Sequence, residues 1–156
     1  MIFVTVGTCS FDSLVEAVDR LRADGDISDD VVCQIGSGSY LPEHCDYFRT
    51  APTLDTWYDR ARMVICHGGT GTVHELLSMG KPFVAVANEQ LSGNHQAEFL
   101  TACEKMFGIL WCRRLDRLSA AIGEVHLRKP QLASCGDLAG DLRDYLDGLH
   151  RRRAGR

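Results

Sequence analysis

The stretch that decides the fold is Cys66-His67-Gly68-Gly69-Thr70-Gly71-Thr72-Val73-His74-Glu75-Leu76-Leu77. It continues a short apolar run over residues 63–66, and its second half has the spacing of a helix over residues 72–79, with Gly80 as the C′ residue. A strand, a glycine-rich turn and a helix therefore follow one another directly. Because the first N–H groups of a helix have no partner within it and carry partial positive charge, the turn predicts an anion site suited to a diphosphate.

The turn holds five candidate phosphate-binding residues: Gly68, Gly69, Thr70, Gly71 and Thr72. Glycine removes the Cβ atoms that would hold a phosphate away from the backbone, and threonine adds a hydroxyl donor. The turn is not a Walker loop, because no Gly-Lys-Ser/Thr follows, and it is not G-x-G-x-x-G, because Val73 and His74 come next. The alternative is that the glycines only let the strand and the helix pack tightly.

Three ionisable side chains flank this turn. Glu75 lies three residues past Thr72, where a carboxylate can accept hydrogen bonds from the ribose hydroxyls of a nucleotide. The alternative is a capping box, Thr72-x-x-Glu75, in which the carboxylate reaches back to the helix start. The roles of His67 and His74 also have two interpretations, since a histidine can add positive charge beside a phosphate or can simply make a structural hydrogen bond. No H-x-x-x-H or H-E-x-x-H pattern indicates a metal.

Outside the turn, short β-branched runs alternate with longer amphipathic stretches. The predicted strands are residues 2–6, 31–35, 46–48, 63–66, 83–87 and 108–112. The predicted helices are residues 11–23, 53–61, 72–79, 95–105, 115–125 and 137–149. This alternation predicts an α/β fold with a mainly parallel sheet and helices on both faces. Such sheets bind ligands at the carboxyl ends of their strands, where Gly7-Thr8 follows the first strand and Gly68-Gly69 the fourth.

A second polar loop follows the fifth predicted strand: Asn88-Glu89-Gln90-Leu91-Ser92-Gly93-Asn94-His95-Gln96. Its amide side chains both donate and accept hydrogen bonds, which suits the hydroxyls of a sugar. From composition alone, the alternative is a hydrophilic surface loop in which Asn94 caps the next helix.

Taken together, the two loops resemble glycosyltransferase family 28, in its C-terminal donor-binding domain. The resemblance is carried by Gly68-Gly69-Thr70-Gly71-Thr72, Glu75, Gly80-Lys81-Pro82, Asn88 and Asn94-His95-Gln96. The opening Phe3-Val4-Thr5-Val6-Gly7-Thr8, followed by Phe11-Asp12, is similar to a narrower branch of that family. This branch comprises the small catalytic subunit of the eukaryotic dolichol-linked N-acetylglucosaminyltransferase and the bacterial PssE-type exopolysaccharide subunits. The resemblance covers roughly residues 1–112.

The resemblance implies one Rossmann-like domain, equivalent to the C-terminal half of a GT-B glycosyltransferase, with the acceptor-binding domain on another polypeptide. It implies that the turn of residues 68–72 holds the diphosphate of a UDP-sugar and that Glu75 binds its ribose. It also implies that His95 and Gln96, with Asn94 beside them, bind the transferred sugar.

Further site residues follow from the same resemblance. Gly7 and Thr8 would line the floor of the cleft, and backbone groups near Thr50–Leu54, with Ala51 as a possible site residue, would hold the uracil. His67 and Asn88 are additional candidates; relatives vary at the position of His67, which leaves its role open.

The implied reaction is the attack of an acceptor hydroxyl on the anomeric carbon of a UDP-sugar, with UDP as the leaving group. Hydrogen-bond donors aimed at the diphosphate stabilise the charge that develops on it, so neither a cofactor nor a metal is expected, and the chain has no D-x-D motif. The resemblance places the catalytic base on the partner's side of the cleft. The acceptor in this branch is a lipid-linked sugar at the cytoplasmic face of the membrane.

Composition sets the limits of the prediction. The chain has 156 residues, of which 45% are hydrophobic, enough for one domain over residues 1–150 with a basic tail over residues 151–156. A formal net charge of −4 argues against nucleic acid as a partner. Seven scattered cysteines without a C-x-x-C pair argue against disulfides and zinc, and favour a reducing cytosol. No signal peptide or transmembrane helix is predicted, so a membrane-anchored acceptor-binding subunit would recruit this cytoplasmic chain.

Other functions remain open from the sequence. A UDP-sugar epimerase can share the double-Rossmann architecture, although such enzymes usually carry both halves in a longer chain. A non-catalytic subunit that binds nucleotide sugars, or a self-sufficient homodimer, would keep the same nucleotide site.

Overall fold

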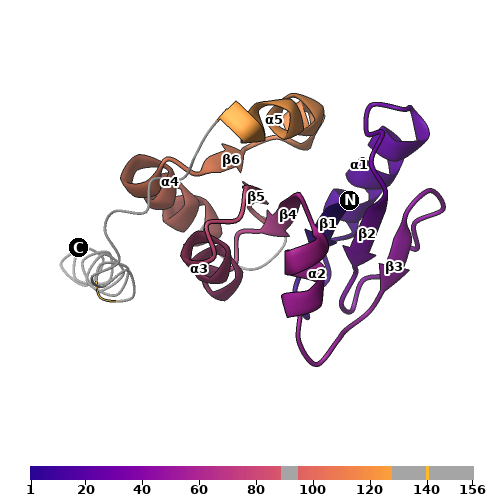
Figure 1. The fold of residues 1–156 in the computed structure, drawn as a ribbon, viewed down its shortest axis with the longest axis horizontal. Coiled ribbons are helices and arrows are strands. Elements are labelled where there is room, and N and C mark those ends of the chain that lie inside the picture. Colours follow the sequence, from indigo (N-terminus) through magenta and orange to yellow (C-terminus); the bar gives the residue numbers. More distant parts are fainter. Residues whose placement is uncertain (89–94, 128–139, 141–156) are drawn as a thin grey trace.

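The computed structural model describes residues 1–88, 95–127 and 140 of the chain (Figure 1). Its elements are β1 (Ile2–Thr5), α1 (Asp12–Ala23), β2 (Val31–Gln34), β3 (Asp46–Phe48), α2 (Asp55–Arg60), β4 (Met63–His67), α3 (Thr70–Ser78), β5 (Phe83–Val86), α4 (His95–Phe107), β6 (Leu110–Cys112), η1 (Leu115–Arg117), α5 (Leu118–Glu124) and η2 (Val125–Leu127). Asn94, the predicted helix over residues 137–149 and the tail of residues 151–156 lie outside the described residues.

The six strands form one sheet in the order β3-β2-β1-β4-β5-β6, and every neighbouring pair is parallel. The predicted α/β fold with a mainly parallel sheet is therefore confirmed. The strand β1 lies in the middle, where Ile2 pairs with Val31 of β2 on one side and with Met63 of β4 on the other. The strands β2 and β3 are added on one side of β1, and β4, β5 and β6 are then added on its other side. The switch point of the sheet, where α/β folds bind their ligands, thus lies between β1 and β4.

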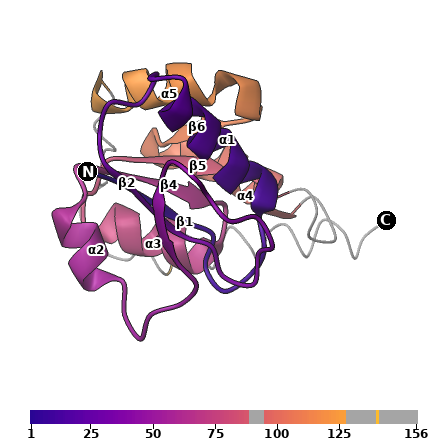
Figure 2. The same cartoon turned by 90° about the vertical axis from the view of Figure 1, so that its right-hand side faces the viewer.

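Two apolar clusters cover the two faces of the sheet, since successive strand residues point to opposite sides. Val4 and Ile65 pack with α1 and α5 on one face, and Phe3 and Val64 pack with α2, α3 and α4 on the other. Figure 2 shows α1 and α5 above the strands and α2 and α3 below them. All of these strand residues are fully buried, so both faces of the central strands are closed to solvent.

Several element boundaries differ from the sequence-based prediction. The helix α3 begins at Thr70 rather than at residue 72, because Gly69 has extended backbone (φ −70°, ψ 133°) and its carbonyl accepts the Val73 N–H at 3.0 Å. The predicted helix over residues 115–125 is divided into η1 and α5. The helix α2 is shorter than predicted and begins only at Asp55, whose N–H donates to the Thr53 hydroxyl at 3.1 Å.

The connection between β2 and β3 is held by a carboxylate rather than by a helix of its own. Asp19 of α1 is buried and accepts hydrogen bonds from the Tyr40 hydroxyl (2.9 Å) and from the N–H groups of Glu43 (3.0 Å) and His44 (2.8 Å). Burial acts to raise the pKa of Asp19, but these hydrogen bonds together outweigh it and lower the pKa. Asp19 thereby holds residues 40–44 of the connection to the edge strand β3.

The cysteines within the described residues are free, and four of them, Cys33, Cys66, Cys103 and Cys112, are buried. In this setting cysteine acts as a small apolar side chain. Across residues 1–88 and 95–127, no helix combines the length and the apolar character needed to cross a bilayer.

Candidate functional site

Three of the predicted site segments follow neighbouring strands of the sheet. Gly7 and Thr8 follow β1, the turn of residues 68–72 follows β4, and Asn88 follows β5. The carboxyl ends of parallel strands meet at one edge, and β1, β4 and β5 are adjacent, so the structure brings these segments together. This edge at the switch point is the candidate site.

The start of α3 is free of side-chain caps. Gly69 is the N-cap residue and no side chain hydrogen-bonds to the first turn of the helix in the part of the chain that is described. Thr70 and Gly71 are exposed. The capping box between Thr72 and Glu75 does not form, because the helix starts two residues before Thr72. The N–H groups at the start of α3 are thus open to an anion.

The three glycines of the turn meet different surroundings. A Cβ at Gly68 would lie 2.8 Å from Leu100 Cδ1, and a Cβ at Gly69 would lie 2.3 Å from His67 Nε2. Both positions are therefore needed for close packing, as the alternative in the sequence analysis proposed. A Cβ at Gly71 would meet nothing within 4 Å. Packing does not explain Gly71, and its Cα faces open space at the helix start.

His67 fills the space between the two loops at the switch point. A Cβ at Gly7, which has a positive φ of 67°, would lie 3.0 Å from His67 Cε1, so glycines on both loops make room for the ring. Burial lowers the pKa of His67 and outweighs the opposing effect of the Thr5 backbone. Its Nδ1 is buried and has no hydrogen-bond partner within the described residues. The imidazole is therefore held neutral beside the helix start.

The loop after β1 is fixed by buried polar contacts. The Thr5 hydroxyl donates to Gln34 Oε1 at 2.5 Å and accepts the Gly7 N–H at 3.2 Å. A Cβ at Gly36, whose φ is 54°, would lie 2.2 Å from the Cys9 carbonyl oxygen, so the loops after β1 and β2 touch through their backbones. Thr8 is exposed at this edge. These contacts fix the backbone of the loop that carries Gly7 and Thr8.

Glu75 lies on the exposed side of α3, one turn from the helix start. Its Oε2 accepts a long hydrogen bond of 3.5 Å from the Tyr58 hydroxyl of α2. Burial, with the charge of Glu75 as a smaller cause, raises the pKa of Tyr58. No sequence pattern links Tyr58 to Glu75, since the two residues lie on different helices. Ala51 is partly buried in the segment that leads from β3 to α2.

The end of β5 and the start of α4 are tied together by two amides. Asn88 is 2% exposed, its N–H donates to Gln96 Oε1 at 2.8 Å, and its Nδ2 donates to the Ser10 carbonyl at 2.9 Å. His95 is exposed as the first residue of α4. Gln96, which was predicted to bind the sugar, and Asn88, an additional candidate, are therefore brought together and hydrogen-bond to each other.

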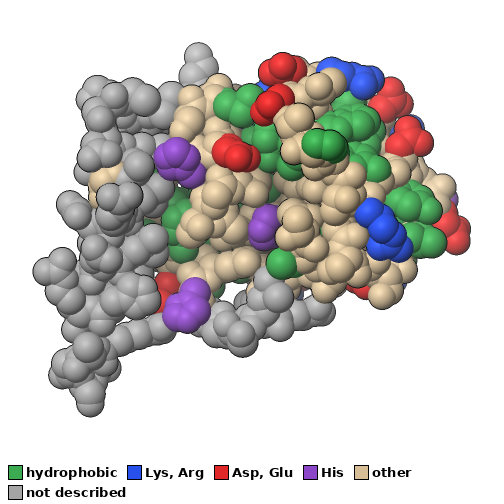
Figure 3. Space-filling view, turned by 90° about the horizontal axis from the view of Figure 1, so that it is seen from below, with side chains coloured by type: hydrophobic (Ala, Val, Ile, Leu, Met, Phe, Trp, Pro, Cys, Tyr) green, Lys and Arg blue, Asp and Glu red, His purple; other side chains and the backbone are tan. Residues whose placement is uncertain are grey.

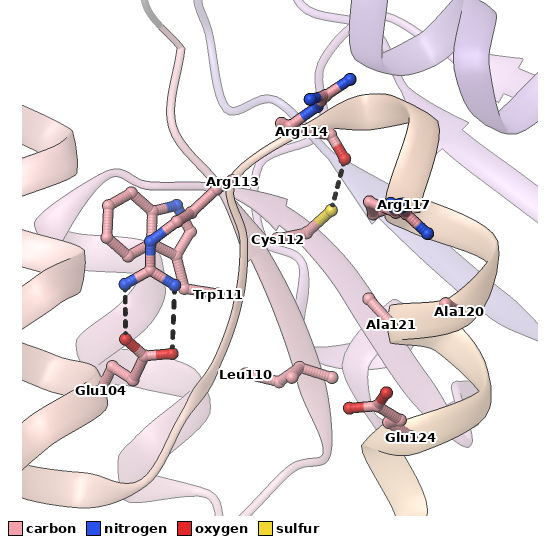
Figure 4. A pocket seen from close by; sticks show the side chains of 10 residues that line it. All are labelled: Glu104, Leu110, Trp111, Cys112, Arg113, Arg114, Arg117, Ala120, Ala121 and Glu124. Atoms are coloured by element: carbon pink, nitrogen blue, oxygen red, sulfur yellow. Dashed lines mark hydrogen bonds and ion pairs between the residues drawn. The ribbon is translucent and has the colours of Figure 1, made fainter.

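Two cavities lie beside the edge strand β6. One, of about 390 Å³, opens between α4 and α5, where Arg113 stacks on Trp111 at 4.0 Å and pairs with Glu104 (Figure 4). The other, of about 410 Å³, lies near Ala87 and the start of α1 and is lined by Arg113 and Arg114. Neither cavity contains a residue of α3, so the anion site proposed here lies apart from both.

Side chains of several kinds share the face of the molecule that Figure 3 draws. Figure 3 shows histidine, acidic and apolar side chains across one face, with Lys and Arg sparse among the residues drawn in colour. In residues 1–88 and 95–127, no group of three His, Cys, Asp or Glu side chains lies close enough to hold a metal ion. The turn at α3 offers N–H and hydroxyl donors, which bind anions.

Comparison with known proteins identifies relatives for most of the chain. Residues 1–138 match the glycosyltransferase family 28 C-terminal domain. The human UDP-N-acetylglucosamine transferase subunit ALG13 is 36% identical over 122 residues, a match that covers 71% of this chain and 11% of that protein. The mouse protein of the same name is 36% identical over 123 residues, covering 70% of this chain and 10% of its own length. The chain thus spans about a tenth of these two relatives.

Solved structures share the fold at low sequence identity. The solution NMR structure of ALG13 superposes with a TM-score of 0.56 at 19% identity, covering 83% of this chain and 87% of that one. The crystal structure of MurG from Acinetobacter baumannii gives a TM-score of 0.57 at 16% identity, covering 80% of this chain and 40% of that one. The chain therefore corresponds in fold to a part of the larger MurG structure, as expected for half of a GT-B glycosyltransferase.

Proposed function

Because the chain belongs to the glycosyltransferase family 28 C-terminal domain family, we propose that it is the donor-binding subunit of a two-component glycosyltransferase that uses a UDP-sugar. The observation that carries the proposal is the helix start of α3: an uncapped turn with exposed Thr70 and Gly71, located at the switch point of a parallel sheet. Such a turn suits the diphosphate of a nucleotide sugar.

In the proposed reaction an acceptor hydroxyl attacks the anomeric carbon, the bond to the β-phosphate oxygen breaks, and UDP leaves. The leaving diphosphate gains negative charge in the transition state. Fixed N–H groups at the start of α3, with the hydroxyls of Thr70 and Thr72, stabilise that charge more than they stabilise the bound substrate. Removal of one such donor is expected to cost about 3–4 kcal/mol of transition-state stabilisation, by analogy with oxyanion-hole donors.

The other contacts follow from the order of groups along a UDP-sugar. With the diphosphate at residues 68–72, Glu75 is one turn further along α3 and is assigned to the ribose hydroxyls. The exposed carboxylate of Glu75 can accept hydrogen bonds from both ribose hydroxyls. The Tyr58 hydroxyl donates a long hydrogen bond of 3.5 Å to its Oε2. Backbone groups near Ala51 are assigned to the uracil, and His95 and Gln96, with Asn94 beside them, to the transferred sugar. No metal is assigned to this site.

The two-component part of the proposal rests on the relatives. The human and mouse relatives are named as transferase subunits, and this chain covers 40% of the MurG chain to which it is similar. We assign the acceptor-binding half and the catalytic base to a separate, membrane-anchored subunit, the acceptor to the lipid-linked sugars, and the site of action to the cytoplasmic face of the membrane. The named relatives favour UDP-N-acetylglucosamine as the donor.

Substitution of Glu75 tests the nucleotide site. Glu75→Ala is expected to weaken UDP binding about 10- to 100-fold, since two hydrogen bonds to a charged acceptor are lost. Calorimetric titration with UDP and with UDP-N-acetylglucosamine should show the same loss for both, because the ribose is common to them. Glu124→Ala, which removes an exposed carboxylate from α5, is the matched control. Unchanged UDP affinity in Glu75→Ala would remove the ribose assignment, and a wild-type chain that does not bind UDP would remove the proposal.

A further inference from the structure

Asn88 joins two loops of the candidate site. Its side-chain Nδ2 donates to the carbonyl of Ser10, in the loop between β1 and α1, at 2.9 Å. Its backbone N–H donates to Oε1 of Gln96, in the first turn of α4, at 2.8 Å. With 2% of its surface exposed, Asn88 is itself closed to a ligand. It therefore acts inside the protein, between segments that are 78 residues apart in the sequence.

The hydrogen bond to Asn88 fixes which end of the Gln96 amide is used internally. A backbone N–H can only donate, so the Gln96 atom that faces it has to be the oxygen, whichever way the amide is drawn. The nitrogen, Nε2, then remains for other partners. Within residues 1–88 and 95–127, no group accepts a hydrogen bond from it.

The same amide also touches the phosphate turn. A Cβ at Gly68 would lie 3.2 Å from Gln96 Oε1, which leaves the carboxamide packed closely against the backbone that leads into α3. Three segments therefore meet at Gln96: the end of β4, the end of β5 and the start of α4. The hydrogen bond from the Asn88 N–H fixes the Gln96 oxygen at this junction and leaves Nε2 on the other side of the amide.

We propose that Asn88 is a positioning residue and that it makes Gln96 a pure hydrogen-bond donor toward the transferred sugar. This inference rests on the proposed function. The sugar group that Gln96 meets has to supply a lone pair, as a hydroxyl oxygen, an acyl carbonyl oxygen or a carboxylate oxygen does. The hydrogen bond can form only while Asn88 holds the amide in place.

The sugar contact is measured as the ratio of the Kd for UDP to the Kd for UDP-N-acetylglucosamine, obtained by calorimetry on the full chain. Gln96→Ala is expected to reduce this ratio about tenfold, because it weakens the binding of UDP-N-acetylglucosamine more than the binding of UDP. Gln96→Glu keeps an oxygen for the Asn88 N–H but presents a second oxygen, rather than a donor, to the sugar. It should therefore reduce the ratio of the two Kd values as much as Gln96→Ala does. A ratio retained in Gln96→Glu would show that Gln96 accepts from the sugar, and would overturn the inference.

Asn88 is tested through its dependence on Gln96. Asn88→Ala and Asn88→Asp both remove the donor to the Ser10 carbonyl, and each should lower the ratio while the Kd for UDP stays the same. The double variant Asn88→Ala/Gln96→Ala should be no worse than Gln96→Ala alone, because the two residues act through one contact. Additive losses, or an equal loss of UDP binding, would show a purely structural role. Thr101→Ala is the control, since it removes a hydrogen bond of α4 to the Ala97 carbonyl away from Asn88.

A measurement without ligand separates this inference from the proposed function. Gln96→Ala is expected to speed hydrogen exchange at the Asn88 amide in the free protein, because the amide loses its acceptor. Unchanged exchange would defeat the inference alone. Absence of UDP binding by the wild-type chain would defeat the proposed function, and the sugar contact with it.

Discussion

Gly69 and Gly71 lie two residues apart, yet only one of them has neighbours that a side chain would displace. At Gly71 a Cβ would enter open space. Gly71→Ala is therefore expected to raise the free energy of unfolding by about 0.5–1 kcal/mol, because alanine is the better helix former. The same Cβ would stand where a phosphate approaches the backbone, so the affinity for UDP should fall. Urea unfolding and calorimetry with UDP measure the two effects.

Gly123 supplies the comparison for Gly71. It lies in α5, and a Cβ there also meets nothing within 4 Å. Gly123→Ala should raise stability by a similar amount and leave UDP affinity as it is. If Gly71→Ala behaves in the same way, the phosphate does not come close to Gly71.

His67 predicts a pH dependence of stability. Burial lowers its pKa in the folded protein, whereas the unfolded chain has the ordinary histidine value of about 6.5. As the pH falls through the ordinary histidine value, the unfolded chain takes up its proton more readily than the folded chain does, so the free energy of unfolding decreases. Substitution by glutamine removes this difference.

Urea unfolding of the wild type and of His67→Gln at several pH values between 5 and 8 checks this prediction. The wild type should lose more stability than the variant between pH 7 and 5. Parallel curves for the two proteins would mean that His67 takes up its proton equally well when folded.

Among the elements, the link between β2 and β3 depends on α1. Asp19→Ala would leave the N–H groups of Glu43 and His44 without their acceptor. The expected cost is about 2–4 kcal/mol in the free energy of unfolding, since buried donors without partners are expensive. Because the folded-state pKa of Asp19 is lowered, its contribution is present above the ordinary carboxyl pKa of about 4 and is lost as the pH falls below it.

Chemical denaturation at pH 7 and at pH 3 tests the role of Asp19. The difference between wild type and Asp19→Ala should be large at pH 7 and smaller at pH 3. Asp26→Ala, in the exposed turn after α1, is the control and should lie within about 0.5 kcal/mol of the wild type. A difference that is the same at both pH values would show that the charge of Asp19 is not what holds the connection.

The elements themselves could be predicted from sequence because their signals are local. Five of the six strands appear at short apolar runs, β3 appears at the predicted residues 46–48, and a helix follows the glycine-rich turn as predicted. The start of α3 at Thr70 could not be read, since Gly69 rather than Thr72 takes the N-cap conformation. The division of the helix over residues 115–125 was also missed.

The contacts within the candidate site could not be predicted from the sequence, and the reason is physical. The hydrogen bond from Asn88 to the Ser10 carbonyl joins positions far apart in the chain, and the contact between Tyr58 and Glu75 joins two helices. Neither leaves a periodic pattern, because both depend on how the strands are ordered. The sequence indicated the candidate site residues, but their hydrogen-bond partners can be identified only from the fold.

At the scale of the whole molecule, the proposal predicts a division of labour. The chain alone should bind UDP and UDP-N-acetylglucosamine but transfer little sugar, since the acceptor site and the base are assigned to a partner. Addition of a membrane-anchored acceptor-binding subunit and a lipid-linked sugar should raise turnover by several orders of magnitude, because base catalysis and orientation of the acceptor are both restored. A radiolabelled transfer assay with either subunit alone and with both measures this.

Two outcomes would contradict that division. Full activity of the chain alone, together with a dimeric mass in solution, would favour a self-sufficient homodimer. Binding of the UDP-sugar without any transfer in the presence of the partner would make the chain a non-catalytic binding subunit.

The central place of β1 has a consequence for what the loss of this strand would do to the sheet. Within the described part of the chain, β1 alone joins the pair of strands β2 and β3 to the three strands β4, β5 and β6. Its removal would not trim a border of the sheet; it would split the molecule into two incomplete halves, each with an unpaired inner strand. The side chains of residues 2–4 contribute to both hydrophobic layers, so the loss of β1 would disrupt the two layers together.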